Sequence, residues 1–220
     1  AREGAAVVLV ARSAEPTEAL AEGIRQAGGR AIAVVADVAA DAAMQQAVAA
    51  GLAAFGRLDI AFNNATDGPR PAPLAELDLD GFDRGIRTNV RGTFIGMRHE
   101  IPALLASGGG AIVNMASLAG VIGVSGLGAY VSGKAGIIGL SKVAALDYAD
   151  RGITVNVVAP GPILTHHLEA AGPEAQRQAG LSTAMRRIGR ADEVASVVSW
   201  LCSEGASFLT GAGVPIDGGQ

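Results

Sequence analysis

Residues 111–160 read AIVNMASLAGVIGVSGLGAYVSGKAGIIGLSKVAALDYADRGITVNVVAP, and their pattern decides the fold. The stretch begins and ends with short apolar runs, which predict strands at 111–117 and 154–160. The segment after Gly128 instead carries apolar residues at helical spacing over several turns. A strand, a helix and a second strand in this order predict a βαβ unit with parallel strands.

The same alternation runs along the whole chain. Further strands are predicted at 5–11, 30–38, 58–65 and 213–217, and further helices at 15–27, 41–56, about 80–105 and 191–203. This order is typical of an α/β protein with a doubly wound parallel sheet. We expect one domain spanning residues 1–220, with a variable segment at 161–189.

Composition narrows the class of function. The chain has 220 residues, half of them apolar, so it can bury a large core. A net charge of −4 without a basic cluster argues against nucleic acid or an anionic membrane as partner. The single cysteine, Cys202, excludes an internal disulfide, and no apolar run approaches the ~20 residues that span a bilayer. We therefore expect a cytoplasmic protein with a small-molecule substrate.

Tyr130 and Lys134 are four residues apart in the predicted helix, so both side chains lie on one face, one turn apart. At about 4 Å and an effective dielectric of about 20, a charge pair interacts by roughly 4 kcal/mol. The ammonium therefore favours loss of the phenolic proton, and the tyrosine can give and take a proton. Alone the pair is a weak signal, because a phenol against a lysine stem is also common on solvated helix faces.

The carboxyl ends of the predicted strands carry polar or turn-forming residues, namely Arg12, Asp37, Asn63, Ser117 and Pro160. In a doubly wound sheet, ligands bind outside the carboxyl ends of the strands. These positions therefore predict a cofactor site.

Five features resemble the classical short-chain dehydrogenase/reductase family, and the resemblance covers all 220 residues. They are Asn63-Asn64-Ala65, Asn89, Ser117 thirteen residues before Tyr130, Lys134 four residues after it, and Pro160-Gly161 followed by Ile163 and Thr165. The resemblance implies a Rossmann-like fold that transfers a hydride between a nicotinamide cofactor and a carbonyl or secondary-alcohol substrate. It also implies a homodimer or homotetramer, paired through the helices that contain Asn89 and Tyr130.

By this resemblance Tyr130 is the general acid/base, and Ser117 donates a hydrogen bond to the same substrate oxygen. Lys134 favours the phenolate and binds the nicotinamide ribose. Asn89 kinks its helix and holds a water that links Lys134 to solvent. An asparagine within a helix can instead simply bond to a neighbouring carbonyl.

The resemblance assigns Asp37 and Val38 to the adenine, although Asp37 could alternatively cap the helix that begins near Asp41. Arg12 follows Ala11, where an acidic residue would favour NAD. A guanidinium at this place suits a 2′-phosphate, so NADP(H) is favoured. NAD(H) stays possible if Arg12 is only a solvated surface residue.

Asn63, Ala65 and Thr66 are expected to line the inner ribose. Thr66 stands where the family has glycine, and a β-branched residue would be strained there if the backbone needs positive φ. The remaining cofactor contacts that the resemblance implies, around the nicotinamide, are Pro160, Gly161, Ile163 and Thr165.

The segment 161–189 is expected to form the substrate lid. Its His166 and His167 have no third ligand nearby in the pattern, so no metal is expected. The lid and the loop Asp67–Pro73 are expected to define the substrate. An apolar pocket is suggested by Leu118, Val124 and Met185.

Family members begin with a strand, a glycine-rich turn and a helix that hold the cofactor pyrophosphate. Residues 1–30 contain no such unit, so we expect a fragment whose missing central strand lies between strands 5–11 and 58–65. Two other functions remain open. One is an NAD-linked dehydrogenase of a sugar, steroid or other alcohol, and the other is a cofactor-free structural homologue.

Overall fold

The computed structural model of the chain describes residues 1–220, apart from the side chain of His167. Its strands are β1 (Val7–Ala11), β2 (Ala31–Val35), β3 (Ile60–Asn63), β4 (Gly110–Met115), β5 (Ile153–Pro160) and β6 (Gly213–Ile216). Its α-helices are α1 (Ala14–Gln26), α2 (Asp41–Phe55), α3 (Leu79–Ile86), α4 (Gly92–Ala106), α5 (Gly128–Tyr148), α6 (His166–Ala170), α7 (Gly172–Leu181) and α8 (Ala191–Leu201). Each predicted strand and helix is present within a few residues.

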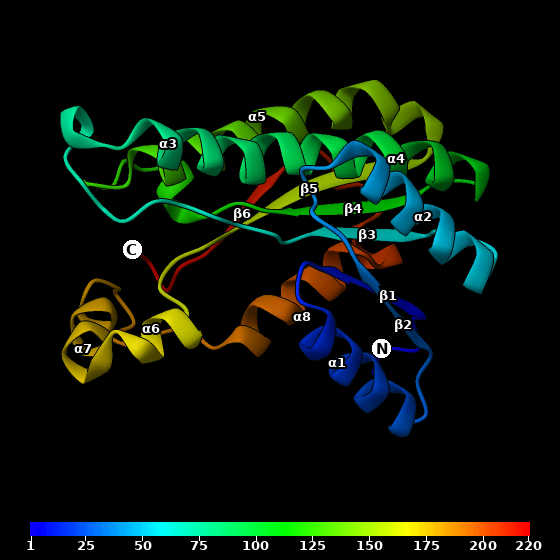
Figure 1. Ribbon diagram of the computed structural model, residues 1–220, viewed down its shortest axis with the longest axis horizontal. Coiled ribbons are helices and arrows are strands. Elements are labelled where there is room, and N and C mark those ends of the chain that lie inside the picture. The colour runs from blue at the N-terminus through cyan, green and yellow to red at the C-terminus, as the bar shows by residue number, and fades with distance from the viewer.

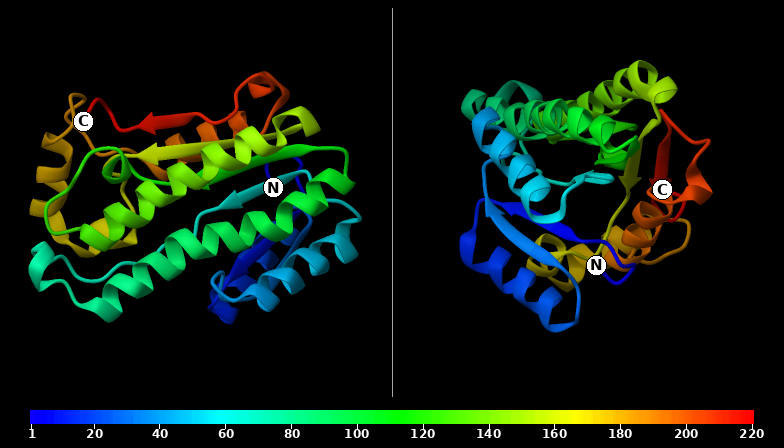
Figure 2. Two further views of the ribbon diagram at one scale, coloured as in Figure 1. Left: turned by 90° about the horizontal axis from the view of Figure 1, so that it is seen from above. Right: turned by 90° about the vertical axis from the view of Figure 1, so that its right-hand side faces the viewer.

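The strands pair in parallel and form two sheets. One has the order β3-β4-β5-β6, and the other contains β1 and β2. Helices α3, α4 and α5 cover one face of the larger sheet and α8 lies on the other, as Figure 1 shows. The α/β class with parallel strands is confirmed. A single continuous sheet is not observed, because β1 does not pair with β3 and the β1–β2 pair lies apart from the larger sheet (Figure 2).

The main core lies between the larger sheet and helices α4 and α5. Ile112 of β4 and Ile153 and Val155 of β5 are fully buried, and Leu104 of α4 packs on them. Strands buried on both faces read as continuous apolar runs, which is why β4 and β5 were recognisable in the sequence.

The helix predicted from about Asp80 to Leu105 is interrupted. α3 ends at Ile86, residues Arg87–Arg91 form a π turn, and α4 continues from Gly92. π turns are rare and often occur at functional sites. This interruption is the main correction to the predicted elements.

Cys202 follows α8 and packs against the second core cluster, which includes Val113, Val158 and Leu201. Burial raises the pKa of the Cys202 thiol to about 11. Trp200, on the same helix, is about half exposed. Among the helices described, none combines the length and the apolar character needed to cross a membrane.

Candidate active site

Tyr130 and Lys134 lie one turn apart near the start of α5, as their spacing predicts. The Nζ atom of Lys134 is 5.6 Å from the centroid of the Tyr130 ring. Tyr130 is partly buried, whereas only 1% of Lys134 is exposed. The phenol therefore has a buried cation beside its ring and keeps access to the surface.

The end of β4 holds the Lys134 ammonium. Its Nζ donates a hydrogen bond of 2.9 Å to the Met115 carbonyl oxygen. Burial disfavours the charged amine and lowers the pKa of Lys134 to about 8. Lys134 is therefore mostly charged at pH 7, yet it gains and loses its proton close to physiological pH.

Ser117 lies directly after β4 and caps the short 3-10 turn η3 (Leu118–Gly120). Its Oγ accepts a hydrogen bond of 3.2 Å from the Ala119 amide, so its own hydrogen stays available for donation. A Cβ on Gly120 would lie 2.7 Å from the Lys134 carbonyl carbon, and glycine permits this close approach. The packing holds the Ser117 turn against the turn of α5 that carries Lys134.

Asn89 lies within the π turn and is completely buried. Its Nδ2 donates to the carbonyl oxygens of Gly85, at 2.9 Å, and Asp67, at 2.6 Å. Its Oδ1 accepts a hydrogen bond of 2.9 Å from the Thr66 hydroxyl. Bonding to the Gly85 carbonyl is the local alternative that the sequence left open, and it is present. The predicted water relay through Asn89 stays a prediction.

The π turn contacts several parts of the site. Asn89 packs against α5 at Gly133, where a Cβ would lie only 2.9 Å from the Asn89 Cβ. Arg87 donates a hydrogen bond of 3.0 Å to Asp37 at the end of β2. Because Asn89 also bonds the loop after β3, this one turn ties together the ends of β2 and β3 and the helix that carries Lys134.

Asp37 already has partners for both carboxylate oxygens. Oδ1 accepts from the Ala39 amide at 2.9 Å, and Oδ2 accepts from Arg87. Helix α2 begins at Asp41 with Ala40 as its N-cap and no side-chain cap bond, so Asp37 caps the preceding turn and not the helix. Each carboxylate oxygen retains a lone pair that could accept a hydrogen bond from an adenine amine.

The other predicted cofactor residues divide into two groups. Those with exposed side chains beyond the strand ends are Arg12 after β1, Ala65 and Thr66 after β3, and Thr165 after β5. Those packed on the protein are Val38 against Gly92, Gly161 against Asp217, Ile163 paired with Gly189, and Pro160 at the end of β5. Among the residues that the structure describes, only Arg186 is a non-glycine with positive φ, so the strain considered for Thr66 does not arise.

Asn63 points its amide into the protein. Its Nδ2 donates to Glu100 at 3.0 Å and to the Asn114 side chain at 2.9 Å, and Asn114 in turn donates to Ser141 at 2.8 Å. These hydrogen bonds join β3, β4, α4 and α5 beneath the site. The contact of Asn63 with a cofactor ribose stays a prediction.

The sequence analysis did not single out Glu100, which is buried on α4. Met97, Ile101 and Leu104 lie on the same buried face of the helix, and their apolar spacing could have placed Glu100 there. Burial raises the pKa of Glu100 to about 7, although the hydrogen bond from Asn63 works in the opposite direction.

Two cavities lie near the predicted lid. The smaller has a volume of about 170 Å³ and contains Ser117 in its wall. Its other lining residues are mostly apolar, namely Leu118, Ala119, Ile122, Val124, Pro160, Gly161, Pro162 and Gln220. Because the family resemblance predicts that Ser117 bonds the substrate oxygen, the smaller cavity is the candidate substrate site.

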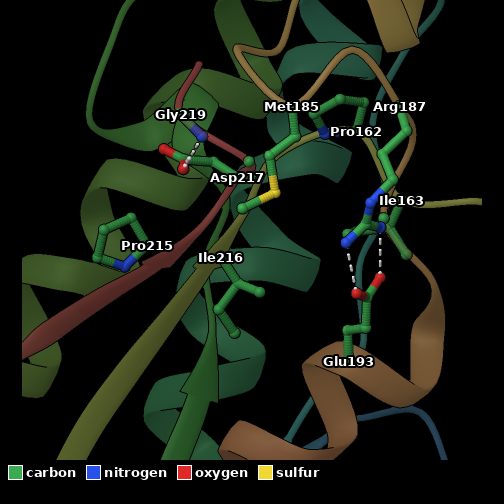
Figure 3. Close-up of a pocket in the computed structure, with 11 residues that line it drawn as sticks. Pro162, Ile163, Met185, Arg187, Glu193, Pro215, Ile216, Asp217 and Gly219 are labelled. Atoms are coloured by element: carbon green, nitrogen blue, oxygen red, sulfur yellow. Dashed lines mark hydrogen bonds and ion pairs between the residues drawn. The ribbon is translucent and has the colours of Figure 1, made fainter.

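The larger cavity has a volume of about 330 Å³ and lies between the lid and the end of β6 (Figure 3). Ile163, Met185 and Ile216 give it an apolar wall. Arg187 and Glu193 form an ion pair of 2.7 Å beside it, and this pairing lowers the pKa of Glu193 to about 2. The two charges largely neutralise each other.

The lid contains α6 and α7. His166 is exposed at the start of α6, and the predicted exposure of the His167 side chain lies outside the described part of the structure. Within the side chains described, no three His, Cys, Asp or Glu residues gather as a metal ion would require.

Comparisons with known proteins give matches over the full chain. The family model described as "Enoyl-(Acyl carrier protein) reductase" matches residues 1–220. A cyclohexanol dehydrogenase of Acinetobacter sp. (strain SE19) is 41% identical over 218 residues, covering 99% of this chain and 86% of that protein. An A-factor type gamma-butyrolactone 1'-reductase (1S-forming) of Streptomyces virginiae is 41% identical over 223 residues, covering 100% and 87%.

A solved structure agrees at the level of the fold. The crystal structure of an NAD+-bound xylitol dehydrogenase superposes with a TM-score of 0.93 at 33% identity. The match covers 99% of this chain and 90% of that one.

Proposed function

The chain belongs to the classical short-chain dehydrogenase/reductase family, and on that premise we propose that it transfers a hydride between NADP(H) and a carbonyl or secondary-alcohol carbon, with Tyr130 as general acid/base. It is an oxidoreductase that acts on CH–OH groups with a nicotinamide cofactor. The observation that carries the proposed role of Tyr130 is the buried Lys134 ammonium, 5.6 Å from its ring.

The bound nicotinamide would supply the hydride in reduction and accept it in oxidation. In reduction, Tyr130 gives its phenolic proton to the substrate oxygen and becomes a phenolate. Lys134 stabilises that phenolate by its charge. Ser117 donates a second hydrogen bond to the same oxygen, and two such donors stabilise the developing alkoxide by a few kcal/mol. In oxidation, the phenolate takes the proton back from the alcohol.

The residues at the strand ends fit a dinucleotide. Asp37 retains acceptor capacity for an adenine amine, and Arg12 is exposed just beyond β1. No carboxylate precedes Arg12, since position 11 is Ala11, so a 2′-phosphate meets a cation and no anion there. This favours NADP(H). The NAD+-bound relative keeps an NAD-linked dehydrogenase as the second candidate.

The substrate cavity supports a neutral, apolar substrate. Leu118, Ile122 and Val124 surround Ser117 in the cavity of about 170 Å³, and the side chains of its lining carry no charge. A relative named cyclohexanol dehydrogenase is consistent with a small ring ketone or alcohol. We therefore propose small, uncharged cyclic ketones and secondary alcohols as the substrate class.

Titration of the purified protein with NADPH and with NADH, followed by fluorescence, tests the cofactor. Tighter binding of NADPH is expected, and Arg12→Ala should weaken NADPH while leaving NADH unchanged. Equal binding of both, with no effect of the substitution, would overturn the NADP(H) assignment. In the same assay Tyr130→Phe should bind cofactor normally while turnover falls roughly 100-fold or more. Near-normal turnover would eliminate Tyr130 as the acid/base.

A further inference from the structure

Thr66 makes a contact that a glycine at its position could not make. It lies beyond β3, and its hydroxyl donates a hydrogen bond of 2.9 Å to Oδ1 of the buried Asn89. The family resemblance predicts glycine here. The threonine therefore adds a hydrogen-bond donor to the loop after β3.

The hydrogen-bond pattern fixes the direction of this bond. Asn89 Nδ2 faces the carbonyl oxygens of Gly85 and Asp67, which can only accept. The amide must therefore present Oδ1 to Thr66, and the hydroxyl must donate. The two carbonyls thus select this orientation of the Asn89 amide, and the Thr66 hydroxyl supplies the donor that its oxygen needs.

The position of Asn89 bears directly on α5. A Cβ on Gly133 would lie 2.9 Å from the Asn89 Cβ and 3.2 Å from its Cγ, so helix and side chain are in tight contact. Gly133 immediately precedes Lys134, whose burial sets its proton affinity. Movement of the Asn89 side chain would therefore change the packing beside Lys134.

Loss of the Thr66 hydroxyl would leave a buried acceptor without its donor. A buried polar atom without a partner is strongly unfavourable, so water would enter the π turn or the Asn89 side chain would shift toward another donor. Either change loosens the turn that also bonds Asp37 through Arg87.

We infer that Thr66 is a positioning residue, whose hydroxyl fixes the Asn89 amide in the π turn and, through Asn89, the packing of α5 beside Lys134. Its contribution to the reaction rests on the proposed function, whereas its structural effect does not.

The test compares Thr66→Val, which keeps the shape and removes the hydroxyl, with Thr66→Ser, which keeps the hydroxyl. Hydrogen exchange of peptides covering residues 85–91, measured by mass spectrometry without cofactor or substrate, is the first readout. Exchange should quicken about tenfold in the valine variant and stay at the wild-type rate in the serine variant. This readout judges the inference even if no substrate turns over.

Two further readouts use the full enzyme. In Thr66→Val, kcat should fall about tenfold and the alkaline limb of its pH profile should move, while NADPH affinity stays within about threefold. Thr66→Ser should keep both the wild-type kcat and the wild-type alkaline limb of the pH profile. Wild-type exchange in the valine variant would overturn the inference, as would a serine variant as defective as the valine one. A loss of NADPH affinity alone would instead make Thr66 a cofactor contact.

Discussion

Burial of Lys134 disfavours the positive charge of its side chain. Burial lowers the pKa of Lys134 from 10.5 to about 8, so the folded state releases this proton at lower pH than the unfolded state does. The stability that goes with the neutral amine is complete above pH ~10.5 and is lost as pH falls to about 8. At pH 7 the charged lysine therefore weakens the fold, although the proposed mechanism requires the charge.

Lys134→Met tests this opposition. We expect a higher melting temperature than wild type at pH 7, because the buried charge is replaced by an apolar chain of similar length. The difference should shrink at pH 10, where wild-type Lys134 is already neutral. Thermal unfolding at both pH values measures this, and turnover should fall roughly 100-fold or more. A variant less stable than wild type by the same amount at both pH values would contradict the prediction.

The stability contribution of Glu100 depends on pH in the opposite direction to that of Lys134. Its pKa rises from 4.5 to about 7 in the folded state, so its contribution to stability is complete below pH 4.5 and is lost as pH rises toward 7. At about 1.36 kcal/mol per pKa unit, the loss is about 3 kcal/mol. Glu100→Gln should remove this pH dependence.

Chemical denaturation of wild type and Glu100→Gln at pH 5 and pH 8 measures the effect of Glu100. The variant should be the more stable protein at pH 8 and close to wild type at pH 5. Glu18→Gln, at an exposed position on α1, is the control and should leave the pH dependence intact. An unchanged slope in Glu100→Gln would show that another group carries it.

At this scale the sequence predicted local pairs and missed distant ones. Tyr130 and Lys134 meet because residues four apart on a helix share a face, which spacing alone reveals. The Thr66–Asn89 bond joins residues 23 apart, and the Asn63–Glu100 bond joins residues 37 apart. No local pattern predicts such contacts, because they depend on how the elements pack.

Among the elements, the π turn explains where the sequence fell short. Periodicity predicts one helix over about 80–105, because the added residue of the π turn shifts the apolar face without removing it. Asn89 gave a hint of irregularity, since asparagine bonds to nearby backbone groups. The contacts of this turn with α5 join residues far apart in the sequence, so no local pattern predicts the π turn.

Gly133 provides the prediction for these elements. Gly133→Ala should destabilise the protein by about 1–3 kcal/mol, because its Cβ would collide with Asn89 across the π turn. Gly23 lies within α1 with open space around it, so Gly23→Ala should stabilise by up to about 1 kcal/mol. Urea denaturation of both variants provides the measurement. Equal effects would mean that helix propensity, and not the contact with Asn89, dominates.

For the whole molecule, alternating strands and helices were sufficient to predict the class and the parallel pairing. The two-sheet arrangement is a long-range property, since it depends on which strands lie side by side. Segment 161–189 was the least predictable part, because α6 and α7 are short and carry weak periodicity.

The outer faces of α4 and α5 carry apolar side chains. Leu146 is 84% exposed, and Val143 and Phe94 are about half exposed. We propose that these helices pair between subunits in a homodimer or homotetramer. Leu146→Glu should dissociate the assembly, because a carboxylate at the centre of an apolar interface loses its water.

Light scattering after size-exclusion chromatography measures the mass of the assembly. Leu20→Glu, at an exposed leucine on α1, is the matched control and should leave the mass unchanged. A monomeric wild type, or an unchanged mass for Leu146→Glu, would rule out pairing through this surface.

The single cysteine of this chain, Cys202, can report local opening of the fold through its rate of chemical labelling. Cys202 is packed at the end of α8 with its proton held tightly, so a thiol-reactive dye meets a poor nucleophile as long as that end stays closed. Because Cys202 is only partly buried, labelling is slow while α8 stays packed on the sheet and becomes faster when α8 lifts from it. The labelling rate of the native cysteine therefore measures how often α8 opens from the sheet. Repeating the measurement with cofactor and substrate bound shows whether ligand binding slows that opening.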